Sequence, residues 1–270
     1  MLKNINYPSL NGFNFMIKRS ILNRENHIHE IDLHSHPELE IYINLSGDVS
    51  FLVENRLYPV ERGDIIISRP GEYHHCVYRS EKEHNLFWIL LESDKNANIF
   101  NFLLKDLGSN LISPDKKTKE KIIEICNTLM DEKLSDFDRY YYLFTLIMLI
   151  KSNLQINILS KDTLPQELNF ALDYIDSHIS ENIKISDIAK SLYISESTLE
   201  RRFKKHLDMK PLEFIHKKKM LFAAEQLRNG ESVLNAGLSV GFSDVSYFIG
   251  VFKRFYGITP YQYKKNAQQN

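Results

Sequence analysis

The sequence predicts a mixed α+β protein of two domains. A β-barrel followed by helices forms the N-terminal part, and the C-terminal domain consists only of helices, with two helix-turn-helix units. Three observations predict this fold class: apolar residues alternate in short runs before residue 94, they recur every three or four residues after it, and one segment near the C-terminus is repeated. The length of 270 residues fits two domains, and a composition of 43% hydrophobic and 26% charged residues fits packed globular cores.

Within residues 1–94, five runs of alternating apolar residues predict the strands of an antiparallel barrel. The runs are Glu40–Leu45, Val49–Val53, Arg56–Val60, Asp64–Ser68 and His84–Leu91. Turn residues such as Ser46-Gly47 and Pro70-Gly71 lie between them. For the first 30 residues we expect a flexible arm that could fold over the barrel.

Residues 95–156 form a predicted helical linker, with helices over 98–107, 116–133 and 137–154. Apolar residues such as Ile122, Ile125 and Leu129 follow the spacing of an amphipathic helix. The apolar stripe has two explanations that the sequence leaves open: packing onto the barrel of the same chain, or dimerisation through Lys116–Leu154. The polar stretch Asn157–Pro165 then predicts the connection to a third segment, residues 163–270.

A repeat organises this third segment, because residues 201–211 and 250–260 are similar at an offset of 49 residues. Each copy belongs to a pattern of helix, tight turn and second helix. We therefore expect helix-turn-helix units at about 185–206 and about 233–256, joined by a helix at about 211–228.

Capping residues support both units. In the first, Ser186 and Ser195 can cap the two helices; in the second, Ser243 or Asp244 can cap the second helix. Gly241 is expected in the turn of the second unit, because glycine accepts a positive φ there.

Charge is unevenly distributed along the chain. The whole chain has 34 basic and 35 acidic residues, and its net charge of −1 indicates no particular partner. Residues 1–162 contain 19 basic and 23 acidic side chains, a net −4, whereas residues 163–270 contain 15 and 12, a net +3. Basic side chains that neutralise phosphates supply most non-specific DNA affinity, so this charge and the duplicated units together predict binding to double-stranded DNA. For any single charge, a solvated helix face is the simpler explanation.

Three segments, Ile185–Lys204, Val240–Phe248 and Phe252–Tyr263, resemble the signature of AraC-type transcription regulators, the AraC/XylS family. The resemblance covers residues 165–265. It implies that two recognition helices enter successive major grooves, about 34 Å apart on one face of the DNA. It also implies a small-molecule effector, a homodimer and, for an activator, contact with RNA polymerase.

The resemblance assigns base contacts to the first recognition helix and phosphate contacts to the ends of both helices. The base-contacting candidates are Ser197, Thr198, Glu200 and Arg201, and the phosphate-contacting candidates are Lys204, Lys205, Lys253 and Arg254. In the second unit, Ile249-Gly250 stands where family members usually have a polar residue and an arginine. We therefore expect the first unit to supply most sequence discrimination and the second to anchor the protein, through Ser246, Tyr247, Lys253 and Arg254.

The barrel segment contains a His-x-His motif with a glutamate four residues on, and a later histidine after a Pro-Gly turn, which resembles the two motifs of the cupin fold. The residues are His34, His36, Glu40 and His74. Alternation would place His34 and His36 on one face of a strand. Three imidazoles and one carboxylate suit a divalent transition metal such as Zn, Fe, Mn or Ni.

Two other interpretations of this motif remain open. The same four side chains could hydrogen-bond a sugar or another polar effector, with Tyr42, Arg69, Tyr78 and Trp88 lining the cavity. They could also be barrel residues that bind no ligand, and the sensor barrels of the AraC family often keep these positions without a metal.

The leading functional hypothesis is a transcription regulator, not an enzyme, in which a small molecule in the barrel controls promoter binding. The alternative is a metal-dependent cupin enzyme with a helical appendage, and a third is a sensor whose helical domain binds another protein. Two cysteines, Cys76 and Cys126, are too few for a disulfide framework or a thiolate zinc cluster. With no signal peptide and no apolar run long enough to cross roughly 30 Å of hydrocarbon, we expect a cytoplasmic protein without membrane contact.

Overall fold

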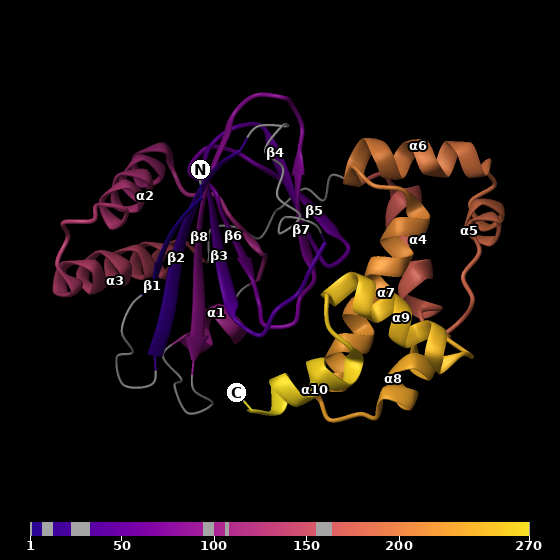
Figure 1. Cartoon of the computed structure of the whole chain (residues 1–270). Coiled ribbons are helices and arrows are strands. Elements are labelled where there is room, and N and C mark those ends of the chain that lie inside the picture. Colours follow the sequence, from indigo (N-terminus) through magenta and orange to yellow (C-terminus); the bar gives the residue numbers. More distant parts are fainter. Residues whose placement is uncertain are drawn as a thin grey trace. The chain divides into compact units, whose positions relative to one another are not determined.

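The computed structural model describes residues 2–6, 13–22, 33–93, 100–105, 108–154 and 164–269. The chain separates into two compact units, Met1–Thr163 and Leu164–Asn270 (Figure 1). The first unit contains both the β-rich segment and the helices that follow it, and the second contains the C-terminal helices. Every helix among the described residues is too short or too polar to span a lipid bilayer.

The described part of the N-terminal unit has two antiparallel sheets and helices packed against one of them. The strands are β1 (Leu2–Asn6), β2 (Phe13–Leu22), β3 (Leu39–Ser46), β4 (Val49–Val53), β5 (Arg56–Val60), β6 (Ile65–Ser68), β7 (His74–Tyr78), β8 (His84–Ser93) and β9 (Leu111–Ile112). The larger sheet has the order β1-β2-β8-β3-β6-β9, and the smaller has the order β5-β4-β7. The helices are α1 (Asn101–Lys105), α2 (Lys116–Leu129) and α3 (Asp136–Asn153).

The five predicted strands correspond to β3, β4, β5, β6 and β8. Strand β7 was missed because His74-His75 interrupts the apolar pattern at its start. In the structure β7 pairs with β4, and Cys76 lies opposite Phe51.

The prediction of a flexible N-terminal arm is wrong for residues 2–6 and 13–22, which form β1 and β2. Strand β2 pairs with β8 along its whole length, from Phe13 opposite Ser93 to Leu22 opposite His84. Polar residues such as Lys18 obscure the strand pattern in the sequence, because β2 lies near the sheet edge and alternates between buried and partly exposed positions. The other residues of the predicted arm lie outside the described residues.

The central strands of the larger sheet are buried on both faces and separate two cores. In β3, Ile41 and Ile43 pack in the core on the helical side, whereas Tyr42 packs in the core between the two sheets. Successive strand residues point to opposite faces, so Glu40 points to the same side as Tyr42, into the space between the sheets. This register places a carboxylate inside the barrel.

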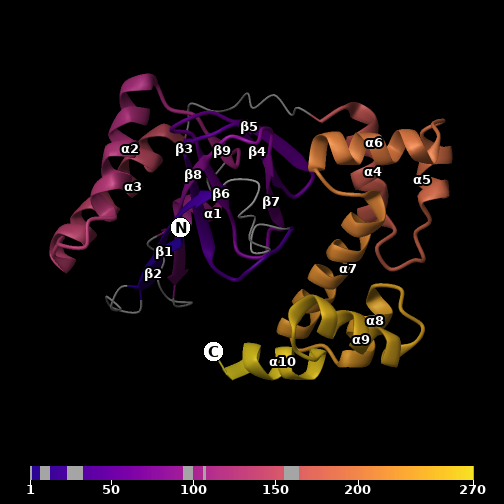
Figure 2. The same cartoon turned by 45° about the horizontal axis from the view of Figure 1, so that its top comes forward.

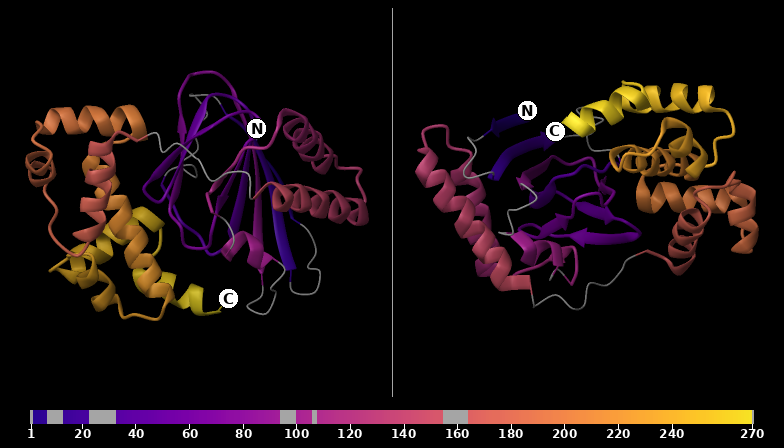
Figure 3. Two further views of the ribbon diagram at one scale, coloured as in Figure 1. Left: turned by 180° about the vertical axis from the view of Figure 1, so that it is seen from behind. Right: turned by 90° about the horizontal axis from the view of Figure 1, so that it is seen from below.

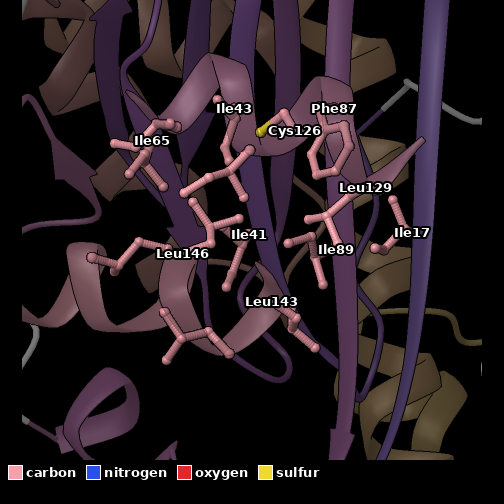
Figure 4. Packing of buried hydrophobic residues seen from close by; sticks show 14 of the residues in the cluster. Ile17, Ile41, Ile43, Ile65, Phe87, Ile89, Cys126, Leu129, Leu143 and Leu146 are labelled. Carbon is pink, nitrogen blue, oxygen red and sulfur yellow. The ribbon is translucent and has the colours of Figure 1, made fainter. Parts of the chain in front are cut away.

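Helices α2 and α3 lie side by side along the outer face of the larger sheet (Figure 3). Figure 4 shows Cys126 and Leu129 of α2 and Leu143 of α3 packed against Ile41 and Ile89 of the sheet. The apolar stripe of the helical segment is therefore buried against the barrel of its own chain, which is one of the two explanations that the sequence left open.

The C-terminal unit contains helices in its described residues and no strand. They are α4 (Gln166–Ser177), α5 (Ile185–Ser191), α6 (Glu196–Leu207), α7 (Pro211–Arg228), α8 (Val233–Ser239), α9 (Val245–Tyr256) and α10 (Pro260–Gln269). Figure 2 shows α7 leading from the α5–α6 pair to the α8–α9 pair. Phe203 packs edge-on against Phe214 at the first pair, and Phe248 and Phe252 pack against Met220 at the second. The predicted fold class is confirmed.

Candidate functional sites

The first helix-turn-helix unit is formed by α5 and α6. Ser195 is the N-cap of α6, as predicted, and its Oγ accepts a 3.2 Å hydrogen bond from the Thr198 backbone N–H. The turn before it contains Tyr193 at a φ of 55°. The predicted cap Ser186 is wrong: α5 begins after Lys184, and Ser186 Oγ instead lies 3.5 Å from Asp187 Oδ1.

The second unit is formed by α8 and α9, and Asp244 rather than Ser243 is the N-cap of α9. The Oδ1 atom of Asp244 accepts hydrogen bonds of 2.8 and 3.1 Å from the backbone N–H groups of Ser246 and Tyr247. Gly241 has a φ of 78°, as the sequence predicted, and a Cβ there would lie 2.7 Å from the carbonyl oxygen of Ser180. The turn therefore requires glycine for two reasons, backbone conformation and close packing.

On α6, the predicted DNA-contacting side chains lie on the exposed side, opposite the buried Leu199, Phe203 and Leu207. Ser197, Glu200, Arg201, Lys204 and Lys205 are all exposed. Thr198 is half-buried, and its Oγ1 lies 2.9 Å from Ser195 Oγ, so part of its hydrogen-bonding capacity serves the cap.

Two neighbouring arginines of α6 have different roles. Arg202 is half-buried and forms a 3.3 Å ion pair with Glu167 of α4. Arg201 is exposed and has no hydrogen bond or ion pair to any described residue. Lys204 is exposed but pairs with Asp208 at 2.6 Å. Of these three cations, only Arg201 has no hydrogen bond or ion pair to a described residue, so its guanidinium is available to a ligand.

On α9, the predicted contacts Ser246, Tyr247, Lys253 and Arg254 are also exposed. Tyr247 and Arg254 additionally line a groove of about 600 Å³ beside α7, together with Leu212 and Phe242. Gly250 lies on the same exposed side, and a Cβ there would meet nothing within 4 Å.

In the barrel, the four predicted residues His34, His36, Glu40 and His74 come together. Each offers one nitrogen or oxygen atom, and these atoms all lie within 4.8 Å of one another. The Glu40 Oε2 atom is 3.1 Å from His36 Nε2 and 3.6 Å from His74 Nε2. We call these four side chains the His3Glu cluster.

The expected strand geometry for His34 and His36 is wrong. His34 forms only an isolated bridge, with hydrogen bonds of 3.1 and 2.9 Å between its backbone and that of His74, and His36 lies outside any strand. Pro37 follows and cannot donate a ladder hydrogen bond, so the chain turns into β3 instead of extending it. The side chains meet because the bridge holds the two segments together.

Two acidic residues that the sequence analysis did not single out support the cluster. His74 Nδ1 lies 3.0 Å from the carbonyl oxygen of Glu72, and His36 Nδ1 lies 3.2 Å from Glu38 Oε2. Only the carboxylate of Glu38, two residues from His36, offered a signal in the sequence, because Glu72 contributes a backbone carbonyl that any residue would supply.

The electrostatics of the cluster favour a charged carboxylate. Burial by itself raises the pKa of Glu40, but the neighbouring imidazoles of His74 and His36 outweigh it and hold the pKa well below its usual range. Burial likewise lowers the pKa of His36, but the neighbouring carboxylates of Glu38 and Glu40 outweigh it and raise the pKa to about 9. Buried charges of this kind need a partner, either each other or a bound ligand.

The remaining predicted effector contacts divide into two groups. Tyr42 and Trp88 face the same interior: their rings are 5.8 Å apart, and Phe51 lies between Tyr42 and His74 at 4.6 and 6.0 Å. Arg69 is not part of this interior set, because it pairs with Glu72 at 2.6 Å and donates to the carbonyl oxygen of Leu104.

Two family models match the chain. Residues 21–130 match an AraC-like ligand binding domain, and residues 188–266 match a helix-turn-helix domain. Together they cover the barrel with its first helices and both helix-turn-helix units.

Several curated regulatory proteins are similar to this chain in sequence. The activator RhaR of Mannheimia succiniciproducens is 25% identical over 86% of both chains. The raffinose operon regulatory protein RafR of Pediococcus pentosaceus is 25% identical over 77% of both chains. The regulatory protein PocR of Salmonella typhimurium is 32% identical, but that match spans 37% of this chain and about a third, 33%, of PocR.

Proposed function

Because the chain belongs to the AraC-type family of transcription regulators, with a DNA-binding domain and a ligand-binding domain, we propose that a small polar metabolite bound in its barrel controls its occupancy of specific promoter sites. The observation that carries this proposal is the tandem pair of capped helix-turn-helix units with exposed polar and basic side chains on both second helices. Such a pair fits successive major grooves.

The first unit supplies most of the sequence discrimination. Arg201 is exposed without a described partner, and its guanidinium can donate two hydrogen bonds to guanine, while Glu200 can accept one from cytosine. The corresponding exposed side of α9 has no side chain at Gly250. The second unit therefore mainly anchors the protein on the DNA, and Lys253 and Arg254 contact phosphates.

The effector is a sugar or a related metabolite that contacts the His3Glu cluster. Imidazole and carboxylate groups hydrogen-bond hydroxyls, and Trp88 and Tyr42 offer aromatic faces on the same side of the sheet. The raffinose operon regulator among the relatives supports this class. An effector acts only if it binds two arrangements of the protein with different affinity.

Dimerisation would use the outer side of α3. Phe137, Tyr141 and Met148 are 80%, 60% and 63% exposed and follow the spacing of one helix face, whereas the opposite face of α3 packs on the barrel. Contact with RNA polymerase and a cytoplasmic location are further parts of the proposal.

DNA binding by the full chain tests the proposal. Fluorescence anisotropy with duplexes selected from genomic fragments should give saturable binding that weakens steeply as salt rises. Candidate sugars should change the affinity. A chain that binds no duplex at low salt, or turns over a metabolite with bound metal, would favour the cupin-enzyme alternative instead.

A further inference from the structure

We propose that the His3Glu cluster binds one divalent transition-metal ion, with His34, His36, His74 and Glu40 as its ligands. Among the described residues, this is the one group of histidine, cysteine and acidic side chains close enough together for such a site. The proposal concerns the same side chains as the effector site, but metal binding needs neither an effector nor DNA.

The spacing of the ligand atoms fits a metal. Bonds of about 2.1 Å place neighbouring ligand atoms about 3.0 Å apart at a right angle and about 3.4 Å apart at a tetrahedral angle. Glu40 Oε2 lies 3.1 Å from His36 Nε2 and 3.6 Å from His74 Nε2. All four ligand atoms lie within 4.8 Å of one another, close to the about 4.2 Å that separates two opposite ligands of one ion, so a small side-chain movement would bring all four within bonding distance.

His74 carries the most direct sign of a missing ligand. The side chain is 1% exposed, and its Nε2 atom is buried with no hydrogen-bond partner, although it points toward Glu40. A buried nitrogen without a partner is costly. A metal ion beside Glu40 would satisfy it.

The surroundings orient the imidazoles as metal sites usually require. The Nδ1 atom of His74 lies at hydrogen-bond distance from the Glu72 carbonyl, which leaves Nε2 directed at the cluster. Beside His36, Glu38 Oε2 lies 3.2 Å from Nδ1 as an ion-pair partner, although not in hydrogen-bond geometry. An acceptor on the far nitrogen fixes the tautomer and increases the basicity of a metal-binding imidazole.

The backbone holds the ligands in place before any ion arrives. The His34–His74 bridge ties two of them together through two main-chain hydrogen bonds, and the ring of Phe51 stacks on His74 at 6.0 Å. Glu40 is fixed by its place in β3. A preformed site loses little conformational entropy on binding.

The donor set selects the class of metal. Three imidazole nitrogens favour Zn, Fe, Mn or Ni over Mg or Ca, which prefer oxygen ligands. One carboxylate ligand brings the net charge of a bound divalent ion and its protein ligands to +1. Four protein ligands leave further positions of a six-coordinate ion for water or for oxygen atoms of an effector.

Metal binding is tested on the full chain after chelator treatment. Titration with CoCl2 and ZnCl2, followed by desalting and elemental analysis, should give about one ion per chain, with a visible Co(II) spectrum and a rise in Tm. The variants Glu40→Gln and His36→Gln should raise the Kd by more than the about 10- to 100-fold that loss of an outer-shell partner costs, because each removes a direct ligand. His75→Gln is the matched control: it removes the neighbouring imidazole on β7, which is outside the cluster, and should leave the Kd unchanged.

Three outcomes would overturn the proposal: no saturable ion in the folded wild-type chain, an unchanged Kd in both cluster variants, or an equal loss in His75→Gln. Circular dichroism of each variant shows that it is folded. Anisotropy with duplex DNA, run on the same samples, separates the two proposals: DNA binding without metal binding refutes the metal site alone, and metal binding without DNA binding refutes the regulator alone.

Discussion

The Nζ atom of Lys219 donates a 2.7 Å hydrogen bond to the carbonyl oxygen of Val240, and a second of 2.6 Å to the carbonyl oxygen of Glu181. Lys219 belongs to α7, Val240 ends α8, and Glu181 precedes α5. One buried ammonium group therefore joins the connecting helix to both helix-turn-helix units. Burial lowers the pKa of Lys219, which shows the cost of placing a cation there.

Replacing this cation tests its structural role. Lys219→Met should lower the free energy of unfolding of the C-terminal unit by about 2–4 kcal/mol, because two buried carbonyl groups lose a charged donor. Lys204→Met is the control: the Lys204 side chain on α6 is 65% exposed and pairs with the exposed Asp208, so its loss should cost less than about 1 kcal/mol. Urea denaturation followed by circular dichroism measures both, and equal effects would contradict the role assigned to Lys219.

The glycines of the second unit are expected to respond in opposite directions. Gly241→Ala should destabilise the unit by about 2 kcal/mol or more, because alanine is strained at a φ of 78° and its Cβ would meet the Ser180 carbonyl at 2.7 Å. Gly250→Ala should stabilise it by about 1 kcal/mol, since the site is helical and open. Thermal unfolding measures both effects: the Tm should fall in Gly241→Ala and rise in Gly250→Ala.

The sequence predicted the C-terminal unit well because each of its features is local. Caps such as Ser195 and Asp244 and the turn at Gly241 depend on a few adjacent residues. The contacts of Lys219 could not be predicted, because they join residues 21 and 38 positions away.

In the N-terminal unit, prediction failed where long-range pairing outweighs local pattern. Strand β2 is specified by its partner β8, more than 60 residues further along the chain, and its polar positions hid it. The His3Glu cluster was predicted from its spacing, but the bridge that assembles it joins His34 to His74 and has no local signature. The ion pair between Arg69 and Glu72 also has no local signature in the sequence. The sequence therefore predicted, wrongly, that Arg69 lines the effector site.

Substitutions of a base-contacting residue and of a phosphate-contacting residue should affect DNA binding in different ways. Arg201→Ala should weaken specific binding by about 1–3 kcal/mol and relax the preference at one base pair, because it removes a bidentate donor. Lys253→Gln should weaken binding to all duplexes alike and reduce the salt slope by about 1, since it removes one phosphate contact. Anisotropy across salt concentrations with cognate and altered duplexes measures both, and an unchanged sequence preference in Arg201→Ala would contradict the assignment.

The exposed stripe of α3 should respond to charge if it forms a dimer. Met148→Glu places a carboxylate on the same face of α3 as Phe137 and Tyr141 and should convert a dimer into a monomer in sedimentation velocity. Lys121→Glu on the exposed side of α2 is the control and should leave the mass unchanged. A wild-type chain that sediments as a monomer at high concentration contradicts this surface.

Gly250 offers the sharpest test of the division of labour between the two units. It lies on the exposed side of α9 with open space around it, so Gly250→Arg can place a guanidinium where family members usually carry one. The expected result is tighter binding or a new base preference in the half-site under α9, because the added fork of donors can pair with guanine. Gly250→Ala separates this from the gain in helix stability, since it supplies the helix former without the donor. Selection of bound sequences from a random duplex pool, run on both variants, gives the answer: the same preferred sequence and affinity in both would mean that this side of α9 does not face the DNA bases.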